Sequence, residues 1–219
     1  MSRQGGVGLV EVLLALSLGL LLLLGASRLF LVASQNWQAQ GIAAQLQEDA
    51  RLALQRMAQD IRMSGMLGCL RADAISHVNP SSAQAFAQPL EITLAADGRL
   101  QLLSLISAEV AGAGGRPNWT LVTDCIRLAR VYADVQVAPA GQYAIPIRRQ
   151  TYRVEGASLM LGSGASYAPL IDNLGELRVD LIRRDSNGIA GLRLSLTLLD
   201  PQSRVRPQQY QLTVALRNG

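Results

Sequence analysis

VLLALSLGLLLLLGAS, from Val12 to Ser27, is the uncharged apolar stretch that decides the fold. The wider segment Val7–Ser34 carries only two charged side chains, those of Glu11 and Arg28. About 20 apolar residues are enough to cross the hydrocarbon of a bilayer as a helix, and residues 7–27 meet that length. The sequence therefore predicts a membrane-length helix near the N-terminus.

The composition of the chain argues against several classes of function. Only 16% of the 219 residues are charged, against about 25% in a typical soluble domain. The net charge of +4 comes from scattered arginines, without the dense basic tract of a nucleic-acid surface. The single histidine and two distant cysteines form no metal motif, and no GxSxG, P-loop or GxGxxG sequence occurs. We therefore expect no enzymatic activity, no metal, no cofactor and no nucleic-acid partner.

Glu11 lies inside the wider segment Val7–Ser34, just before its uncharged part, and needs an explanation. A charge at the centre of a membrane helix costs about 2.5–3.5 kcal/mol even on mild scales, so a carboxylate kept there should have a charged partner. An ordinary cleaved signal peptide ending near Gly25-Ala26-Ser27 is an alternative interpretation of the apolar stretch. Such signals do not carry a carboxylate near the start of their apolar part.

The first eleven residues, MSRQGG followed by VGLVE, resemble the class III signal of type IV prepilins. In that family a prepilin peptidase cuts after the glycine and methylates the new amine. The resemblance implies cleavage between Gly6 and Val7, N-methylation of Val7, and subunit recruitment through Glu11, which pairs with the amine of a neighbouring subunit. Pairing within one helix remains open, because the two groups lie four residues apart. Val7 and Gly8 depart from the family, in which phenylalanine and a larger or hydroxyl-bearing residue are usual.

Residues 35–64 predict an amphipathic continuation of the same helix. The segment contains no proline, and apolar residues recur at three- and four-residue intervals, at Leu46, Ala50, Ala53, Leu54, Met57 and Ile61. We expect this stripe to pack on a folded domain. Asp60 and Arg62 are expected to be ordinary surface charges, with contact to a partner as the alternative. A helix from Val7 to Met63 would be about 85 Å long. Three glycines are places where it could bend: Gly19, Gly25 and Gly41.

EDARLALQRMAQDIRMSGMLGC, residues 48–69, resembles a segment of PilW-type minor pilins, which carries an acidic pair, an Asp-Ile-Arg and a Gly-x-x-Gly-Cys. The C-terminal LTVALRNG, from Leu212, resembles the last strand of that family. The resemblance implies a structural protein that acts in a pilus tip or priming complex, and so in adhesion and twitching motility. It also implies a single-pass protein of the inner membrane with a periplasmic head, later part of a fibre at the cell surface. The implied partners are the prepilin peptidase, other minor pilins, the major pilin and the inner-membrane assembly platform.

Alternative functions share some of these features. A J-type minor pseudopilin of a type II secretion system has the same leader, helix and β-rich head, and genomic neighbours or deletion phenotypes would separate it from a pilus subunit. A periplasmic binding module with a cleaved signal and an anchored enzyme belong to other classes. N-terminal sequencing tests the cleaved signal directly: a start at Val7 supports the prepilin, and a start near Arg28 removes the helix.

Cys69 and Cys125 are the only cysteines of the chain. We expect a disulfide between them, because the C-terminal region would be exported into an oxidising compartment. Two buried free thiols are the alternative.

Residues 65–219 are expected to form a β-rich head. Alanine, serine and proline predict a loop from Cys69 to Pro89 with a solvated His77. The Asp97-Gly98 pair predicts a two-residue hairpin turn between strands. The predicted strands are 90–94, 99–104, 125–137, 147–154, 158–161, 176–183, 192–199 and 209–216. The predicted fold class is α+β and pilin-like, with a mainly antiparallel sheet. The chain is predicted to divide into a leader (1–6), the transmembrane or assembly half of the helix (7–34), the amphipathic half of the helix (35–64) and the head (65–219).

Overall fold

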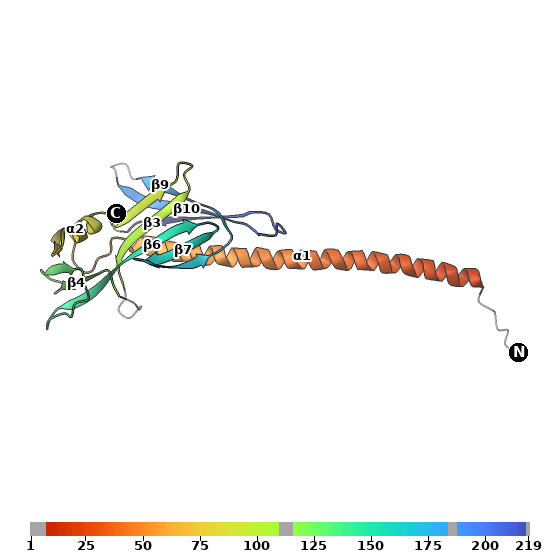
Figure 1. Ribbon diagram of the computed structural model, residues 1–219, viewed down its shortest axis with the longest axis horizontal. Helices are drawn as coiled ribbons and strands as arrows, with labels where there is room; N and C mark the ends of the chain where they lie inside the picture. Colours follow the sequence, from red (N-terminus) through yellow and green to blue (C-terminus); the bar gives the residue numbers. More distant parts are fainter. Residues whose placement is uncertain (1–7, 110–115, 184–187, 218–219) are drawn as a thin grey trace. The chain divides into compact units, whose positions relative to one another are not determined.

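The computed structural model describes residues 8–109, 116–183 and 188–217. The predicted leader, residues 1–6, and Val7 lie outside these ranges. The chain divides into two compact units, residues 1–45 and 46–219, which are described separately. One helix, α1 (Leu9–Met63), supplies its N-terminal part to the first unit and its C-terminal part to the second (Figure 1).

The first unit consists of the apolar part of α1. The helix begins at Leu9, and the Gly8 carbonyl accepts a 2.9 Å hydrogen bond from the amide of Glu11. An 18-residue window of α1 has a mean hydropathy of 2.5, and none of it is buried. The helix is thus long and apolar enough to cross a membrane. It is continuous through the three glycines that were possible bending points: Gly19, Gly25 and Gly41.

The second unit starts with the C-terminal part of α1, which packs on the β-rich head. Its buried residues are Leu46, Ala50, Ala53, Leu54, Met57, Ala58, Asp60 and Ile61. Because this set includes every residue of the predicted apolar stripe, the amphipathic helix is confirmed. Beyond Met63, Gly65 has a φ of 75° and its amide donates to the Ile106 carbonyl at 2.9 Å. Glycine tolerates this left-handed conformation, so the chain turns from the helix directly onto the sheet.

The larger sheet has eight strands in the order β1-β5-β4-β6-β3-β2, with β7 paired to β6 and β8 to β7. Its strands are β1 (Ser76–His77), β2 (Leu90–Leu94), β3 (Leu100–Ala108), β4 (Trp119–Thr123), β5 (Ala129–Tyr132), β6 (Tyr143–Glu155), β7 (Ser158–Ser163) and β8 (Ser166–Ile171). In the described part of the chain, β1 and β5 run parallel and the other paired strands are antiparallel.

The long strand β6 organises this sheet. Ile147 pairs with Ala108 of β3 and with Trp119 of β4, and Thr151 pairs in the same way with β3 and β7. Strand β3 therefore lies along one side of β6, while β4 and β7 follow one another along the other side. Tyr152 is fully buried within β6, which places its hydroxyl group in the interior of the head.

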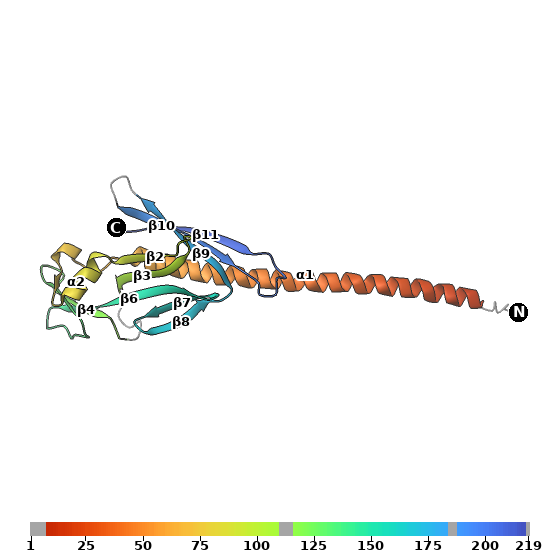
Figure 2. The same cartoon turned by 45° about the horizontal axis from the view of Figure 1, so that its top comes forward.

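A smaller sheet of three antiparallel strands completes the head (Figure 2). Its strands are β9 (Leu174–Arg183), β10 (Ile189–Leu198) and β11 (Gln208–Ala215), in the order β11-β10-β9. Four alternating leucines of β10 are at most 1% exposed: Leu192, Leu194, Leu196 and Leu198. An isolated bridge between Arg99 and Arg178 joins β9 to the residue before β3.

The predicted α+β fold is confirmed, because a long apolar N-terminal helix contacts a mainly antiparallel β head. Most predicted strands agree with the structure to within a few residues. They correspond to β2, β3, β6, β7, β9, β10 and β11. Alternating apolar residues in these segments bury one face each, which is the pattern that made them recognisable.

The loop predicted from Cys69 to Pro89 is wrong. It contains a short 3₁₀ helix, η1 (Ala72–Ala74), the strand β1 and the helix α2 (Pro80–Ala87). The Asn79 side chain caps α2 by accepting a 3.3 Å hydrogen bond from the Ser81 amide, and proline occupies the first turn. Phe86 of α2 is 5% exposed and packs edge-on against Trp119, with ring centroids 5.5 Å apart. Burial of this ring stabilises a helix that the local composition does not indicate.

The strand predicted from Cys125 to Val137 is also too long. Only β5 (Ala129–Tyr132) lies within it, and residues 125–128 form a turn around the Asp124 carboxylate. Strands β4 and β8 were not predicted. Strand β8 contains Pro169, which lowers the strand signal of its segment although proline is tolerated at sheet edges.

The hairpin at Asp97-Gly98 exists but has a longer loop than predicted. The Gly98 amide donates to the Ala95 carbonyl at 2.9 Å, the Ala95 amide donates to the Arg99 carbonyl at 2.8 Å, and Gly98 has a φ of 81°. This is a three-residue loop closed by glycine in the left-handed region, and the β2–β3 register shifts beside it.

Candidate functional site

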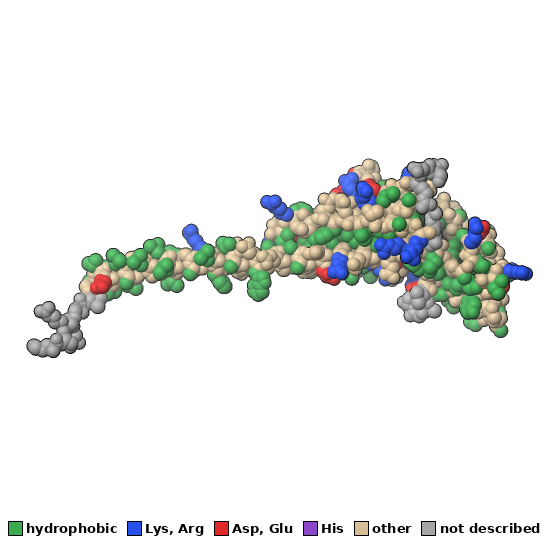
Figure 3. Space-filling model, turned by 180° about the vertical axis from the view of Figure 1, so that it is seen from behind, with side chains coloured by type: hydrophobic (Ala, Val, Ile, Leu, Met, Phe, Trp, Pro, Cys, Tyr) green, Lys and Arg blue, Asp and Glu red, His purple; other side chains and the backbone are tan. Residues whose placement is uncertain are grey.

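The apolar part of α1 exposes a continuous hydrophobic surface in the isolated chain. Figure 3 shows hydrophobic side chains covering the N-terminal part of α1 on the face viewed. Leu9 is 77% exposed, Leu22 76% and Phe30 72%. Soluble monomers rarely expose contiguous apolar patches of more than a few hundred Å². This surface is consistent with a single-pass membrane anchor or with a signal sequence.

Glu11 is the acidic residue of the first turn of α1. A carboxylate is favourable at this end of a helix, because the free amides of the first turn carry partial positive charge. Among the residues that the structure describes, none forms an ion pair with Glu11. Gly6 and Val7 lie outside those residues, so the cleavage site and the methylated amine remain predictions.

Small residues form a stripe beside Glu11, which the sequence analysis missed. At about 100° per residue, five small residues fall within a sector about 40° wide that begins about 40° from Glu11: Gly8, Ala15, Gly19, Ala26 and Ala33. We call this set the small stripe. A Cβ atom added at Gly8 or Gly19 would meet nothing within 4 Å in this chain, so nothing inside the molecule requires glycine there. The 3.6-residue spacing of the small side chains is the signal that could have revealed the stripe.

Asp60 links the end of α1 to β6, which corrects the prediction that it is an ordinary surface charge. Asp60 is 9% exposed. Its Oδ2 accepts hydrogen bonds from the Tyr152 hydroxyl at 2.5 Å and from Arg56 Nε at 3.0 Å. With the Gln150 amide nitrogen turned toward Asp60, that nitrogen donates to Oδ2 at 2.6 Å. Burial and the neighbouring Asp60 charge both raise the pKa of Tyr152, so it stays a neutral donor. Arg62, by contrast, is exposed as expected.

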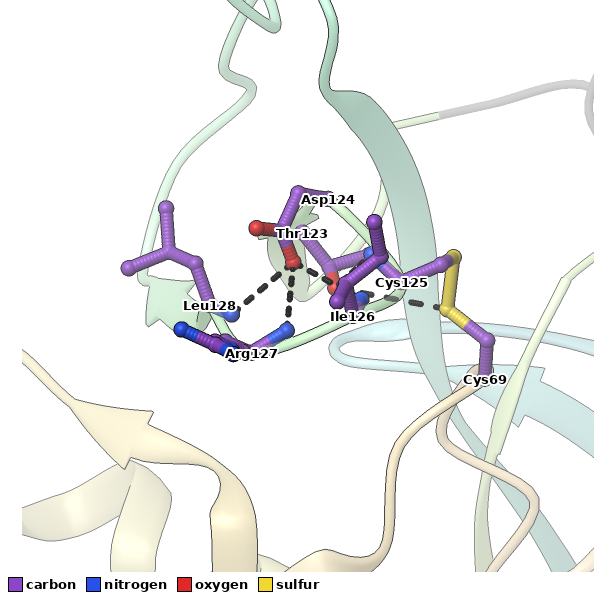
Figure 4. The surroundings of a disulfide bond; sticks show 7 residues. All are labelled: Cys69, Thr123, Asp124, Cys125, Ile126, Arg127 and Leu128. Atoms are coloured by element: carbon purple, nitrogen blue, oxygen red, sulfur yellow. Dashed lines mark hydrogen bonds between the residues drawn. A yellow bond between two sulfur atoms is a disulfide. The ribbon is translucent and has the colours of Figure 1, made fainter.

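A disulfide joins Cys69 to Cys125, as predicted (Figure 4). The two Cα atoms are 5.4 Å apart, and the bond spans a sequence separation of 56 residues. Around it, the Cys125 amide donates to Thr123 Oγ1 at 2.9 Å. The Asp124 carboxylate accepts from three successive amides, those of residues 126–128, and these bonds lower its pKa. The turn that presents Cys125 is thus built by its own two preceding residues.

His77 is half-buried against α2 rather than fully solvated as predicted. Its Nδ1 lies 3.1 Å from Ser82 Oγ, and its ring packs edge-on against Phe86 at 5.2 Å. The Ser82 hydroxyl donates to the Asn79 carbonyl at 2.7 Å, so Nδ1 carries the proton and donates to Ser82. Burial lowers the pKa of His77. In the described part of the chain, no group of three histidine, cysteine or acidic side chains is placed to hold a metal.

The architecture of the molecule is pilin-like: a long apolar N-terminal helix packs by its C-terminal part on an antiparallel β head. No protein-family description, curated protein or solved structure matches the chain. The class of the protein therefore rests on this architecture, and any finer assignment rests on the motifs at the two ends of the sequence.

Proposed function

We propose that this chain is a minor pilin of the PilW-like type, which is trimmed by a prepilin peptidase and enters a type IV pilus through its N-terminal helix. The observation that carries the proposal is an apolar helix surface, none of it buried across the 18-residue window, with one carboxylate in its first turn. The helix N-terminus favours that carboxylate, but in lipid it is costly without a charged partner, and a helix that exchanges lipid for other helices can gain one.

Charge pairing gives Glu11 its role in this proposal. Cleavage after Gly6 creates an amine at Val7, and both charges are costly when either is left alone in a low-dielectric bundle. When the amine of one subunit meets Glu11 of its neighbour, the two charges neutralise each other. Assembly thus becomes more favourable than storage of the subunit in the bilayer.

The small stripe supports close packing of helices in the same bundle. In lipid, helices gain little from hydrophobic contact, and small residues let their backbones approach and make van der Waals contacts. Because Gly8 and Gly19 have open space around them in the single chain, a neighbouring helix accounts for them. The stripe lies next to Glu11, so close approach along it brings a neighbour near the carboxylate.

The head fits a compartment outside the cytoplasm. A disulfide persists in oxidising surroundings, and the Cys69–Cys125 bond ties the segment after α1 to the turn between β4 and β5. We place the unassembled protein in the inner membrane with its head in the periplasm, and the assembled protein in a pilus fibre. Its partners are the prepilin peptidase, other pilins and the inner-membrane platform.

The decisive experiment compares Glu11→Ala with Glu48→Ala. Both remove one carboxylate from α1, but Glu48 is exposed on the head part of the helix. Loss of one member of a buried pair costs about 3–5 kcal/mol, so Glu11→Ala should lower incorporation into sheared fibres by about 100-fold or more, while cleavage continues. Glu48→Ala should be incorporated normally. Normal incorporation of Glu11→Ala would contradict the charge-pairing mechanism.

Sequencing the N-terminus of the mature protein tests processing independently. A start at Val7 with a methylated amine agrees with the proposal, and Gly6→Ala should abolish that start. A start near Arg28 would show an ordinary signal peptide and would end the proposal. Deletion of the gene distinguishes a pilus from a type II secretion system. Loss of twitching motility supports the pilus, and loss of enzyme export supports the J-type pseudopilin.

A further inference from the structure

Strand β11 leaves one side of its backbone unpaired. It lies at the edge of the small sheet and pairs only with β10. The Leu216 amide donates to the Ala190 carbonyl at 3.0 Å, and antiparallel pairing alternates, so the even-numbered residues of β11 bond to β10. The odd-numbered residues, Gln209, Gln211, Thr213 and Ala215, direct their amides and carbonyls outward. All four are exposed, and within the described residues their backbone groups have no partner.

This edge lacks the features that normally prevent strands from pairing. Residues 208–215 contain no charge and no proline, and the β10–β11 register has no shift. The opposite edge, β9, carries Glu176, Arg178, Asp180 and Arg183, has register shifts against β10, and bridges to Arg99. Charges, bulges and coverage are the usual protection of edge strands. The small sheet is therefore protected on one side and open on the other.

A groove of about 470 Å³ runs between β11 and the head part of α1. Its apolar lining comes from Leu54, Tyr210 and Leu212, of which Leu54 is 6% exposed. Its polar lining consists of glutamines and one arginine: Gln47, Arg51, Gln55, Gln209 and Gln211. Because side chains alternate across a strand, a strand added to β11 would direct every second side chain into this groove.

We propose that β11 accepts an uncharged extended segment of a neighbouring subunit as a fourth strand of the small sheet. The inference rests on the proposed function for the source of the segment. Residues 208–215 carry no charge, and the described lining of the groove holds a single charged side chain, that of Arg51, so an uncharged segment suits this largely neutral surface. Its alternate side chains are apolar where they meet Leu54, Tyr210 and Leu212. Strand addition gains its affinity from backbone hydrogen bonds and its selectivity from the side chains in the groove. A segment of about seven residues, paired with residues 209–215, would form hydrogen bonds with every unpaired backbone group on this side of β11.

Hydrogen exchange of the full chain tests the proposal, with the protein alone in detergent compared with the protein in purified fibres. Alone, the amides of Gln209, Gln211, Thr213 and Ala215 should exchange fast, whereas those of Tyr210, Leu212 and Val214 should be protected by β10. In fibres, hydrogen exchange of the four outward-facing amides, those of Gln209, Gln211, Thr213 and Ala215, should slow by about 100-fold or more. Fast exchange of that set in fibres that contain the chain would overturn the inference and leave the proposed function intact.

Thr213→Pro and Thr213→Val form the matched pair. Proline at position 213 removes an outward-facing amide and leaves the hydrogen bonds to β10 in place, and edge strands tolerate proline at such positions. Valine keeps the amide and is therefore the control. The proline variant should lose the gain of protection in fibres, and the valine variant should keep it. A photo-crosslinking residue at position 211 then identifies the occupant. Cross-links to an uncharged extended segment of another subunit support the proposal. Cross-links to β11 of a second copy, or only within one molecule, would overturn it.

Discussion

The Tyr152 hydroxyl donates a 2.5 Å hydrogen bond to Asp60 Oδ2, across 92 residues of sequence. Tyr152 lies in the C-terminal half of β6 and Asp60 in the last turn of α1. The bond therefore fixes which face of α1 is turned to the sheet, because rotation of the helix would leave a buried carboxylate and a buried hydroxyl without partners. Such groups are costly when unpaired.

Tyr152→Phe should lower the free energy of unfolding of the head by about 2 kcal/mol, since hydrogen bonds to charged groups contribute about that much. Urea unfolding of the disulfide-intact protein in detergent measures the loss. Tyr143→Phe is the control, because Tyr143 is 64% exposed and its change should stay within about 0.5 kcal/mol. Equal unfolding midpoints for the two variants would refute a role for the Tyr152–Asp60 bond.

Gly19→Leu should weaken fibre incorporation, and Gly25→Leu should not. Both positions have open space in the single chain, but Gly25 lies about 120° around the helix from Gly19 and outside the small stripe. A bulky side chain on the stripe would separate the helices that we propose to pack there, at a cost of about 1 kcal/mol or roughly fivefold in incorporation. Quantitative blotting of sheared fibres gives the ratio. Equal incorporation of both variants would remove the small stripe from the assembly mechanism.

Reduction of the Cys69–Cys125 bond should destabilise the head by about 4 kcal/mol in the chain-entropy model for a loop of this length. The measurement is urea unfolding with and without a thiol reductant. The double variant Cys69→Ala, Cys125→Ala should unfold as the reduced protein does and should not respond to reductant. A wild-type protein that is insensitive to reductant would show that the bond adds no stability.

Acid should loosen the connection between β10 and β11 through Asp200. Asp200 is 6% exposed, and its carboxylate accepts hydrogen bonds from the Arg204 side chain and from the amides of residues 202 and 204. The Arg204 side chain first, then these amides, lower the pKa of Asp200 from 3.8 to about 2. Because the folded pKa lies below the unfolded one, the stabilisation is complete above the unfolded pKa and is lost as pH falls from about 4 to 2.

The melting temperatures of wild type and Asp200→Asn check this dependence. Their difference should be largest at pH 5 and above, and should shrink toward pH 2. Arg204→Gln should reduce the same pH dependence without changing the carboxylate. A difference that is constant from pH 7 to pH 2 would contradict the assignment.

Periodicity explains which parts of the fold could be predicted from sequence. The stripe from Leu46 to Ile61 repeats at helical spacing because one face of α1 is buried, and the β10 leucines alternate because one face of that strand is buried. Both patterns arise from local geometry, so they are visible without any knowledge of distant residues. The disulfide was predictable because the chain has no other cysteine.

The missed features depend on contacts between distant residues. Asp60 looked like a surface charge, because its partner Tyr152 comes from another element. Helix α2 was missed because seven of its eight residues are proline, serine, alanine or glutamine, and the burial of the remaining one, Phe86, against Trp119 stabilises it. The open edge of β11 follows from the order of strands in the small sheet, which no local pattern encodes. At each of these places the outcome depends on tertiary structure that local propensity does not encode.

The Cys69–Cys125 bond also determines how the protein responds to a pulling force. Tension that enters through α1 and leaves through the strands after Cys125 would pass across the sulfur–sulfur bond. Residues 70–124 lie inside the closed loop, so roughly 190 Å of extended chain cannot be drawn out. With the disulfide intact this part of the head would resist extension, and reduction would let it lengthen under load.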